Sequence, residues 1–483
     1  MGNLLRNVSD FNQALDCYNQ SLVIRTELGD ELMIANTKNN IGAGLSAMSN
    51  LDRAMAFSAE ALRLKTERLG NNSVETGRAL VNMGQLYLDQ KQYMTAERYF
   101  QRGRRIFNDI LGNDQPDIAM CVHKLGVIKE ALSDDDGALE YYLQSINIFK
   151  SNIDYEKNVN LAFSLHNATL IYMKQRDFMT ALDHMIEAVD IKVATLGTSH
   201  SETAASQHFL GTIYIELEDL ESALNHFKDA LQARVQCFGT ENIEVAGTLY
   251  CLGQVHFKRD EFEEAIDCLA ENLRVFRKFS STDNEEVSKA ELLLGSSYQE
   301  RGEFDLAKEH LLQALDIMIS THGSNNLDVA QALFRLGICF CEMNDYTSSL
   351  DKFKECLEIR TNLLGNLHIE CANTYESIGI VQQKIDAHED AIHSFERALA
   401  IKKTALEDDD EDICILMAFI GSSLYELKRY DEAVHYFSDS MERKKKHYGR
   451  ADEEYAMSVV DLASVYAKVK DKHQAMEVSY RDI

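Results

Sequence analysis

The sequence predicts an all-α protein, a solenoid of about 12 antiparallel helix pairs. A period of about 42 residues runs through the 483-residue chain, and Pro116 is its single proline. A chain of this length usually forms several globular domains, joined by linkers rich in proline, glycine or serine. The continuous period and the scarcity of proline favour helices separated by short turns instead. We therefore expect one solenoid over residues 1–483 that begins and ends within a repeat, as a segment of a longer protein or an incomplete gene model would.

The period is clearest at one residue of each repeat, which we call the anchor. The anchors are Gly2, Gly42, Gly84, Gly126, Thr169, Gly211, Gly253, Gly295, Gly337, Gly379, Gly421 and Ala463. Twelve residues after each anchor stands alanine, replaced once by Ser349. An aromatic residue recurs 3 and 16 residues after the anchor, as at Tyr87 and Phe100. Small residues in register let two helices approach closely, and larger rings fill the space between pairs.

A second series of glycines predicts where the helices end. These glycines lie at 29, 70, 112, 197, 239, 323, 365 and 449, each after an apolar helical run. Glycine suits the left-handed conformation that ends many helices. Tyr155, Ser281 and Glu407 replace it in three repeats, so we expect different junctions there. In the repeat of Gly84 the two helices should span about 74–89 and 93–111.

These columns resemble the tetratricopeptide repeat over essentially the whole chain, with its Leu-Gly-x-x-Tyr, alanine, phenylalanine and alanine positions. The period exceeds the usual length of about 34 residues. The surplus equals about two helical turns. Together with junctions such as LGTSHSETA and FGTENIEVA, the longer form resembles the repeats of kinesin light chains. The chain departs from that family in its missing repeat-end proline, its higher copy number and its lack of a heptad coiled coil. The resemblance implies a right-handed superhelix whose concave face is lined by the first helix of each pair.

The charge of the chain narrows the classes of partner. The chain carries 49 basic and 78 acidic residues, a net of −29, which disfavours nucleic acid and anionic membranes as partners. Residues 1–200 hold 20 basic and 25 acidic residues, whereas residues 201–483 hold 29 and 53, so the first part is near neutral. The sequence has neither a signal peptide nor an apolar run long enough to span a bilayer, and its ten cysteines lack disulfide spacing. We expect a cytoplasmic protein.

We find no pattern that predicts catalysis, a cofactor or a metal. The segment Gly42 to Ala47 matches a dinucleotide-binding pattern, but its first glycine is a repeat anchor within a helix. Cys339 and Cys341 lack two further zinc ligands. The acidic runs 134–136 and 407–412 do not have the ligand spacing of a calcium loop, and we interpret them as solvated turns. The sequence predicts a protein that is not an enzyme.

The resemblance implies that a ligand would meet residues six, three and two positions before each anchor. In repeats two to five these are Asn36, Asn39, Asn40, Arg78, Asn82, His123, Lys124, His166 and Asn167. Amide groups both donate and accept hydrogen bonds, so the Asn40, Asn82 and Asn167 ladder could pair with the backbone of an extended peptide. Arg78 and Lys124 add positive charge that suits an acidic peptide. His123, His166 and His208 form a further column that we expect to line the groove. The asparagine clamp that tetratricopeptide proteins use for chaperone tails is absent.

The leading hypothesis is a non-enzymatic adaptor that binds extended segments of other proteins, with a kinesin-type motor or its cargo as a partner suggested by resemblance alone. The alternative is the sensor or regulatory repeat region of a larger signalling or nucleotide-binding protein. A third interpretation, that the groove residues are solvated and the array is a structural spacer, predicts no effect of groove mutations.

Overall fold

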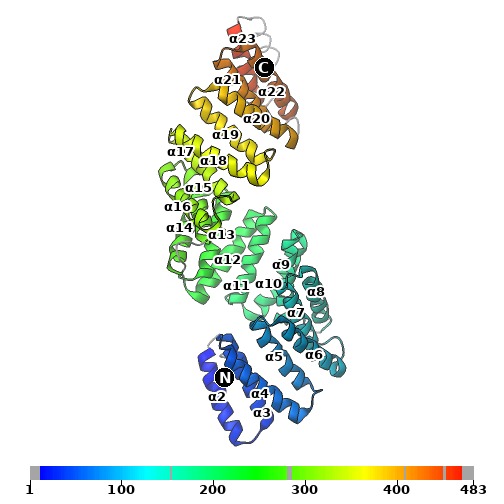
Figure 1. Ribbon diagram of the computed structural model, residues 1–483. Coiled ribbons are helices and arrows are strands. Elements are labelled where there is room, and N and C mark those ends of the chain that lie inside the picture. The colour runs from blue at the N-terminus through cyan, green and yellow to red at the C-terminus, as the bar shows by residue number, and fades with distance from the viewer. Residues whose placement is uncertain (1–10, 153–154, 280–284, 407–409, 450–452, 470–483) are drawn as a thin grey trace. The chain divides into compact units, whose positions relative to one another are not determined.

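The computed structural model describes residues 11–152, 155–279, 285–406, 410–449 and 453–469. Within those ranges the regular structure is entirely helical. Consecutive helices pack against each other in antiparallel pairs (Figure 1). The chain forms two compact units, residues 1–239 and 240–483.

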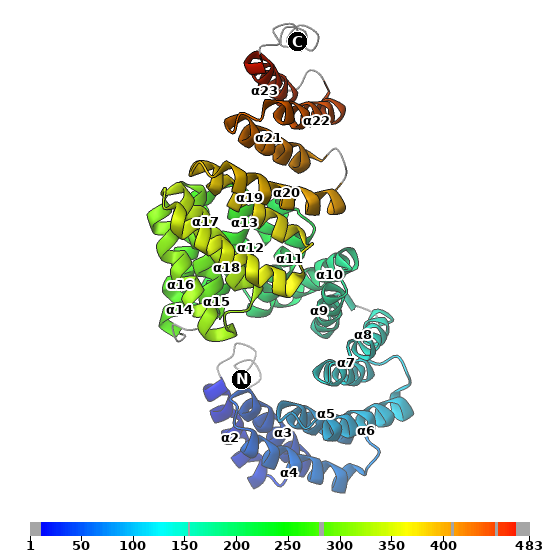
Figure 2. The ribbon, with the colours of Figure 1, turned by 45° about the horizontal axis from the view of Figure 1, so that its top comes forward.

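In the described residues of the N-terminal unit, helix α2 (Phe11–Glu27), the second helix of its repeat, is followed by five helix pairs. The first helices of its pairs are α3 (Glu31–Ala47), α5 (Val74–Asp89), α7 (Pro116–Ala131), α9 (Val159–Lys174) and α11 (Ser201–Glu216). Their partners are α4 (Leu51–Leu69), α6 (Tyr93–Leu111), α8 (Asp135–Lys150), α10 (Phe178–Leu196) and α12 (Leu220–Phe238). Helices α5 and α6, side by side in Figure 2, have the bounds that the sequence predicts. Because α3 also contacts α5 and α5 contacts α7, successive first helices lie next to one another.

The C-terminal unit repeats the same pairing. Its first helices are α13 (Ile243–Lys258), α15 (Glu285–Glu300), α17 (Leu327–Glu342), α19 (Ile369–Lys384) and α21 (Glu411–Glu426). They pair with α14 (Phe262–Phe279), α16 (Phe304–His322), α18 (Tyr346–Leu364), α20 (His388–Ala405) and α22 (Tyr430–Tyr448), and α23 (Glu453–Val469) follows. Here too, first helices of successive pairs contact each other, as α17 contacts α19.

Each glycine anchor in the described residues packs against the residue 16 positions later, which is an aromatic ring in six helix pairs and Ser58, Leu269 or Leu311 in the other three. A Cβ atom built on Gly126 would stand 2.7 Å from the Tyr142 ring, and one on Gly211 would stand 2.9 Å from the Phe227 ring. The one anchor with a larger side chain in this unit, Thr169, faces a position where Met185 replaces the ring. Glycine at the anchor therefore makes room for an aromatic ring between the two helices.

The turns have two recurrent backbone conformations. Seven residues after the anchor, the residue between the helices of a pair adopts φ near +60°, as at Lys91 and Arg176. The eight glycines that the sequence places after helices all have positive φ as predicted. From Gly70 onward their ψ is extended, as at Gly112 with φ 86° and ψ 173°. That combination lies outside the left-handed helical region that the sequence predicts, and essentially glycine alone adopts it. Where Tyr155 replaces glycine, a short 3₁₀ helix (Tyr155–Lys157) forms the predicted different junction, whereas Ser281 and Glu407 lie outside the described residues.

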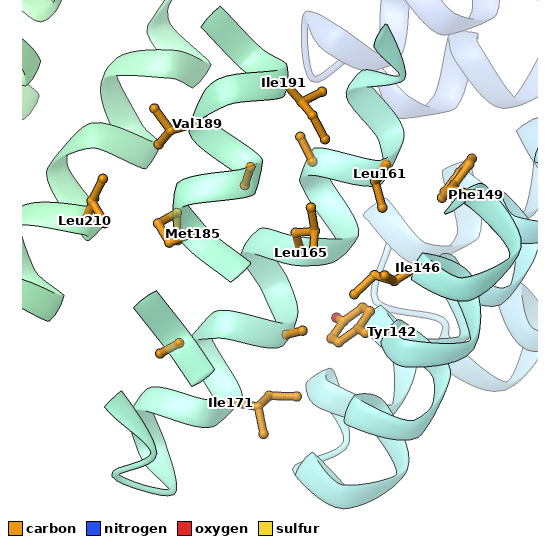
Figure 3. Packing of buried hydrophobic residues seen from close by; sticks show 14 of the residues in the cluster. Tyr142, Ile146, Phe149, Leu161, Leu165, Ile171, Met185, Val189, Ile191 and Leu210 are labelled. Carbon is orange, nitrogen blue, oxygen red and sulfur yellow. The ribbon is translucent and has the colours of Figure 1, made fainter. Parts of the chain in front are cut away.

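The hydrophobic core continues from one pair to the next. Figure 3 shows it in the N-terminal unit, where rings and aliphatic side chains from four successive helices meet. Tyr142, Ile146 and Phe149 of α8 face Leu161 and Leu165 of α9, and Met185 of α10 lies next to Leu210 of α11.

Polar residues cap the starts of many helices. Asp134, from one of the acidic runs, caps α8 by accepting a hydrogen bond from the amide of Gly137 at 3.1 Å.

Candidate functional site

The first helices of the N-terminal unit enclose two adjoining hollows of about 350 and about 360 Å³. The first, which we call the amide hollow, is lined by Asn36, Asn39, Asn40, Lys65, Glu75, Arg78, Val81, Asn82, Phe107, Asp117 and Met120. The second, the lysine hollow, is lined by Met120, His123, Lys124, Val127, Phe149, Asn160, Phe163 and Asn167. The two share Met120. Eight of the nine residues predicted from the sequence thus line two neighbouring hollows, and His166 does not.

The asparagines of the amide hollow have unused hydrogen-bonding groups. Asn36, Asn39, Asn40 and Asn82 are half-buried, and the side chains of these four residues make no hydrogen bond to any residue that the structure describes. The Oδ1 atom of Asn39 is buried without a partner. A buried polar atom without a partner costs about 1–3 kcal/mol. These amides are therefore available to water or to a ligand that enters the hollow.

The charges of the amide hollow balance each other. Nε and Nη2 of Arg78 donate to the two carboxylate oxygens of Asp117 at 3.1 and 3.2 Å, and Glu75 lies 3.4 Å from Nη1. Lys65 Nζ lies 3.1 Å from the Glu75 carboxylate. The bond to Asp117 raises the pKa of Arg78. The sequence predicts that Arg78 adds positive charge to the groove, and in the structure two carboxylates compensate the charge of this exposed guanidinium.

The lysine hollow carries an unbalanced positive charge. The half-buried Lys124 has neither a hydrogen bond nor an ion pair to any residue in the described ranges. Burial lowers the pKa of Lys124, which the more distant charge of Asp89 partly opposes. The half-buried Phe163 adds apolar surface, the fully buried Phe149 closes the floor, and the lining contains no carboxylate. An acidic side chain entering this hollow would meet a cation that nothing else neutralises.

Asn167 is the one member of the ladder that is held in place. Its Nδ2 donates to the Tyr142 hydroxyl at 3.2 Å, and that hydroxyl donates to Glu130 Oε2 at 2.6 Å. Tyr142 stands 16 residues after its anchor. At that position the other repeats of the N-terminal unit have phenylalanine, serine or methionine, except for Tyr18 in the first repeat. A fixed orientation of Asn167 would reduce the entropy lost if a ligand bound to it.

The histidine column serves mainly as packing. His123 is 9% exposed and shares a 3.0 Å hydrogen bond between its Nδ1 and Ser164 Oγ. Nδ1 of His166 lies 3.3 Å from Ser206 Oγ, and the His208 ring packs on Phe227. Burial lowers the pKa of His123, His166 and His208 to about 3, 4 and 3. The prediction that the column lines the groove holds for His123 alone, since the other two line neither hollow.

Sequence reasoning missed the floor of the hollows, which comes from the second helices. Lys65, Phe107 and Phe149 stand 23 residues after their anchors and are spaced by 42 residues, so the same period marks them. Searching the second helix for a column with the groove's period would have found them. The carboxylates of Glu75 and Asp117 lie on first helices, nine residues before their anchors. They were missed because only the positions six, three and two residues before each anchor were considered.

Other chemistry is not evident in the described ranges. No group of three or more His, Cys, Asp or Glu side chains among those residues is placed to hold a metal ion. Cys339 and Cys341 are buried, and burial raises the pKa of Cys339 to about 12. Gly42 lies inside α3, where a Cβ atom would meet Ser58, and not in a loop after a strand. Of the described helices, none combines the length and the apolar character that crossing a membrane requires.

Comparison with known proteins places this architecture in a family. A model described as a tetratricopeptide repeat matches residues 75–151, 160–234, 244–320, 286–362 and 328–404, and a second model of the same description matches 34–75 and 416–454. The clustered mitochondria protein homolog of Homo sapiens is 22% identical over 163 residues, which cover 34% of the chain and 12% of that protein. Its Danio rerio counterpart is 23% identical over 203 residues, 41% of the chain and 14% of that protein.

Solved structures to which the chain is similar include BtubC of P. vanneervenii, with 18% identity, a TM-score of 0.42 and coverage of 48% of this chain and 92% of that one. The tetratricopeptide-like repeats of a putative kinesin light chain from Podosopora anserina are 16% identical, with a TM-score of 0.39 and coverage of 44% and 99%. The repeat models together match more than half of the chain. The chain therefore belongs to the tetratricopeptide repeat family.

Proposed function

We propose that the two hollows form one groove that binds an extended segment of a partner protein, so that the chain acts as a non-enzymatic scaffold or adaptor. The observation that carries this proposal is the set of half-buried asparagine side chains, Asn36, Asn39, Asn40 and Asn82, that bond to no described residue. The tetratricopeptide repeats support a role in protein interaction.

The groove suits an extended chain for geometric reasons. Adjacent packed helices lie about 10 Å apart, which equals about three residues of extended peptide. The same repeat position is occupied by Asn40 in α3, Asn82 in α5 and Asn167 in α9. In α7, between α5 and α9 in the series, Lys124 occupies it. Amides can bond to the peptide backbone whatever its sequence, and Lys124 then selects a segment with an acidic residue. The half-buried Phe163 ring in the lining suits an apolar side chain of the segment.

Affinity capture from an extract of the source organism tests the proposal. The wild-type chain is compared with the triple variant Asn40→Ala, Asn82→Ala, Asn167→Ala, after circular dichroism has shown that both are equally helical. We expect a set of proteins that the wild type retains and the triple variant loses. The retained proteins are then cut into overlapping peptides, and we expect direct binding by a peptide that contains an acidic residue.

A matched control removes three exposed asparagines from second helices, in the variant Asn19→Ala, Asn108→Ala, Asn147→Ala. This control should retain the same proteins as the wild type. Identical capture by wild type and groove variant would exclude the asparagine ladder as a binding site and favour the structural spacer.

We keep the alternative that the repeats are the sensor or regulatory region of a larger signalling or nucleotide-binding protein. The two clustered mitochondria homologues support it in one respect, because the aligned part is 12% and 14% of their length. A transcript that extends the reading frame into a catalytic or nucleotide-binding domain would establish it. We also propose that the chain is cytoplasmic and that its partners are proteins, not nucleic acid or membranes. A kinesin-type motor or its cargo is one such partner, suggested by resemblance alone. Imaging of the tagged chain tests the location.

A further inference from the structure

The C-terminal unit contains a hollow at the same place in its repeats as the amide hollow. It lies between α17 and α19, measures about 480 Å³, and is lined in part by Gln331, Phe334, Arg335, Arg360, Glu370 and Asn373. Relative to the anchors, Arg335 stands where the N-terminal unit has Asn40, and Arg360 stands where it has Lys65. The architecture of the hollow is thus repeated, but its chemistry is changed.

Arg360 forms a rigid floor. It is 6% exposed, and Nη1 donates to the Glu370 carbonyl oxygen at 2.9 Å and to Thr374 Oγ1 at 2.8 Å. Nη2 lies 2.6 Å from the Glu370 carboxylate, and the guanidinium carbon lies 4.7 Å from the centroid of the Phe334 ring. The charge of Arg360 is therefore already compensated, and the contacts fix Phe334 and Glu370 at the sides of the hollow.

Arg335 retains donors for a ligand. Its side chain is 24% exposed, and Nη1 donates to Glu300 Oε1 at 2.8 Å, while its other nitrogens have no partner among the described residues. Glu300 is 41% exposed and does not line the hollow, so this ion pair is a weak surface pair. The side chains of Gln331 and Asn373 form no hydrogen bond within the described ranges. The hollow thus presents a cation and two free amides.

We infer that this hollow is a second binding site, one that takes an acidic residue of an extended protein segment. The carboxylate would accept hydrogen bonds from the unused nitrogens of Arg335, and the amides of Gln331 and Asn373 would pair with the segment's backbone. Phe334 and Leu364, which also line the hollow, would receive a neighbouring apolar side chain. The site is separate from the groove of the N-terminal unit, and its existence does not depend on the proposed function.

The net charge of the C-terminal unit and the charges that line the hollow predict partners of opposite charge. Residues 240–483 hold 27 basic and 47 acidic residues, a net of −20, so net charge alone favours a basic partner. The two arginines and single glutamate of the lining favour an acidic one. If the net charge of the unit decides, a basic peptide binds more tightly; if the lining of the hollow decides, an acidic peptide does. A binding experiment separates these two outcomes.

The probes are three fluorescein-labelled pools of nine-residue peptides with Leu-Asp, Leu-Asn or Leu-Lys fixed at the centre and mixed residues elsewhere. Fluorescence polarisation is measured with the 483-residue chain carrying Asn40→Ala, Asn82→Ala and Asn167→Ala, so that the ladder of the other unit does not contribute. Into this background we introduce Arg335→Gln, Asn373→Ala or, as the control, Lys354→Gln on the exposed face of α18. Thermal unfolding establishes that each variant is folded.

We expect the Leu-Asp pool to bind most tightly, and Arg335→Gln to weaken it about tenfold or more while Lys354→Gln leaves it unchanged. Asn373→Ala keeps every charge and should weaken the Leu-Asp and Leu-Asn pools alike. Equal affinity for Leu-Asp and Leu-Asn, no effect of Arg335→Gln, or no binding of any pool would overturn the inference. Preference for Leu-Lys would assign the unit to basic partners and overturn it as well.

Discussion

Gly379 lies directly against the ring of Phe395, so that a Cβ atom on the glycine would stand 2.6 Å from Cε1 of the phenylalanine. Gly337 has the same relationship with Phe353 in the preceding repeat, and Gly421 has it with Phe437 in the next. Phe395 is fully buried. The anchor and the ring 16 residues later therefore form one packing unit, in which the absent side chain of one residue makes space for the other.

This relationship predicts the effect of one added methyl group. Gly379→Ala should lower the free energy of unfolding by about 1–3 kcal/mol, because Phe395 cannot move without disturbing the helix pair. Gly247 is a matched control, since it lies inside α13 and an added Cβ would have no atom within 4 Å. Gly247→Ala should raise the free energy of unfolding by about 0.5–1 kcal/mol, since alanine favours the helix. Urea denaturation measures both, and a gain from Gly379→Ala would refute the packing argument.

The two kinds of turn predict different costs for alanine. Gly302 stands where other repeats place residues such as Lys91 and Lys428 at φ near +60°, so Gly302→Ala should cost about 1 kcal/mol. Gly365 has φ 89° and ψ 157°, a conformation essentially restricted to glycine, so Gly365→Ala should cost about 1–3 kcal/mol. Neither site has an atom within 4 Å of an added Cβ, so the backbone alone decides. Equal midpoints in thermal unfolding would contradict this ranking.

A buried amide in α14 predicts a difference between two substitutions. Asn272 is fully buried; its Nδ2 donates to the carbonyl oxygen of Ala246 at 2.7 Å, while its Oδ1 has no partner in the described part of the chain. Ser145 and Ser440 hold the same repeat position and donate to the corresponding carbonyl oxygens at 2.8 and 2.9 Å. Asn272→Ser should therefore be about 1 kcal/mol more stable than Asn272→Ala, because serine keeps a donor there. Urea titration of both variants measures the difference, which should vanish if the bond is unimportant.

The buried histidines predict that acid destabilises the protein. Burial lowers the pKa of His123 to about 3, whereas the unfolded chain takes up a proton at a pKa of about 6.5. Below pH 6.5 the unfolded state therefore binds more protons than the folded state. As the pH is lowered from about 6.5 to about 3, the free energy of unfolding decreases. The effect of His123 at pH 5 is about 2 kcal/mol. His123→Gln should reduce the stability difference between pH 7 and pH 5, whereas His393→Gln, at an exposed position, should leave it unchanged. Equal slopes in all three proteins would contradict burial as the cause.

Periodicity predicted what the repeats have in common. The bounds of α5 and α6, the small residues between helices and the positive φ of Gly112 all follow from positions that recur with every repeat. The same reasoning brought the asparagines of the groove together, because equal positions on successive first helices must lie on one face.

What periodicity could not predict depends on single repeats. Arg78 is paired because Asp117 follows in the next repeat, and no pattern within one repeat shows that ion pair. His166 lines neither hollow, although its contact with Ser206 corresponds to the hydrogen bond between His123 and Ser164, so the repeat position alone does not decide which histidine faces a hollow. The extended ψ at Gly112 could not be read from the identity of the residue, since glycine permits several conformations.

The hollows between successive first helices also bear on how such a chain changes over time. Each hollow is assembled from two neighbouring repeats, and its floor residue lies 23 positions after an anchor in both units. Exchange of a single 42-residue block by unequal recombination would leave the packing of anchor and neighbouring side chain intact while moving one hollow's lining to a new place in the series. Duplication would similarly add a hollow without requiring any new core.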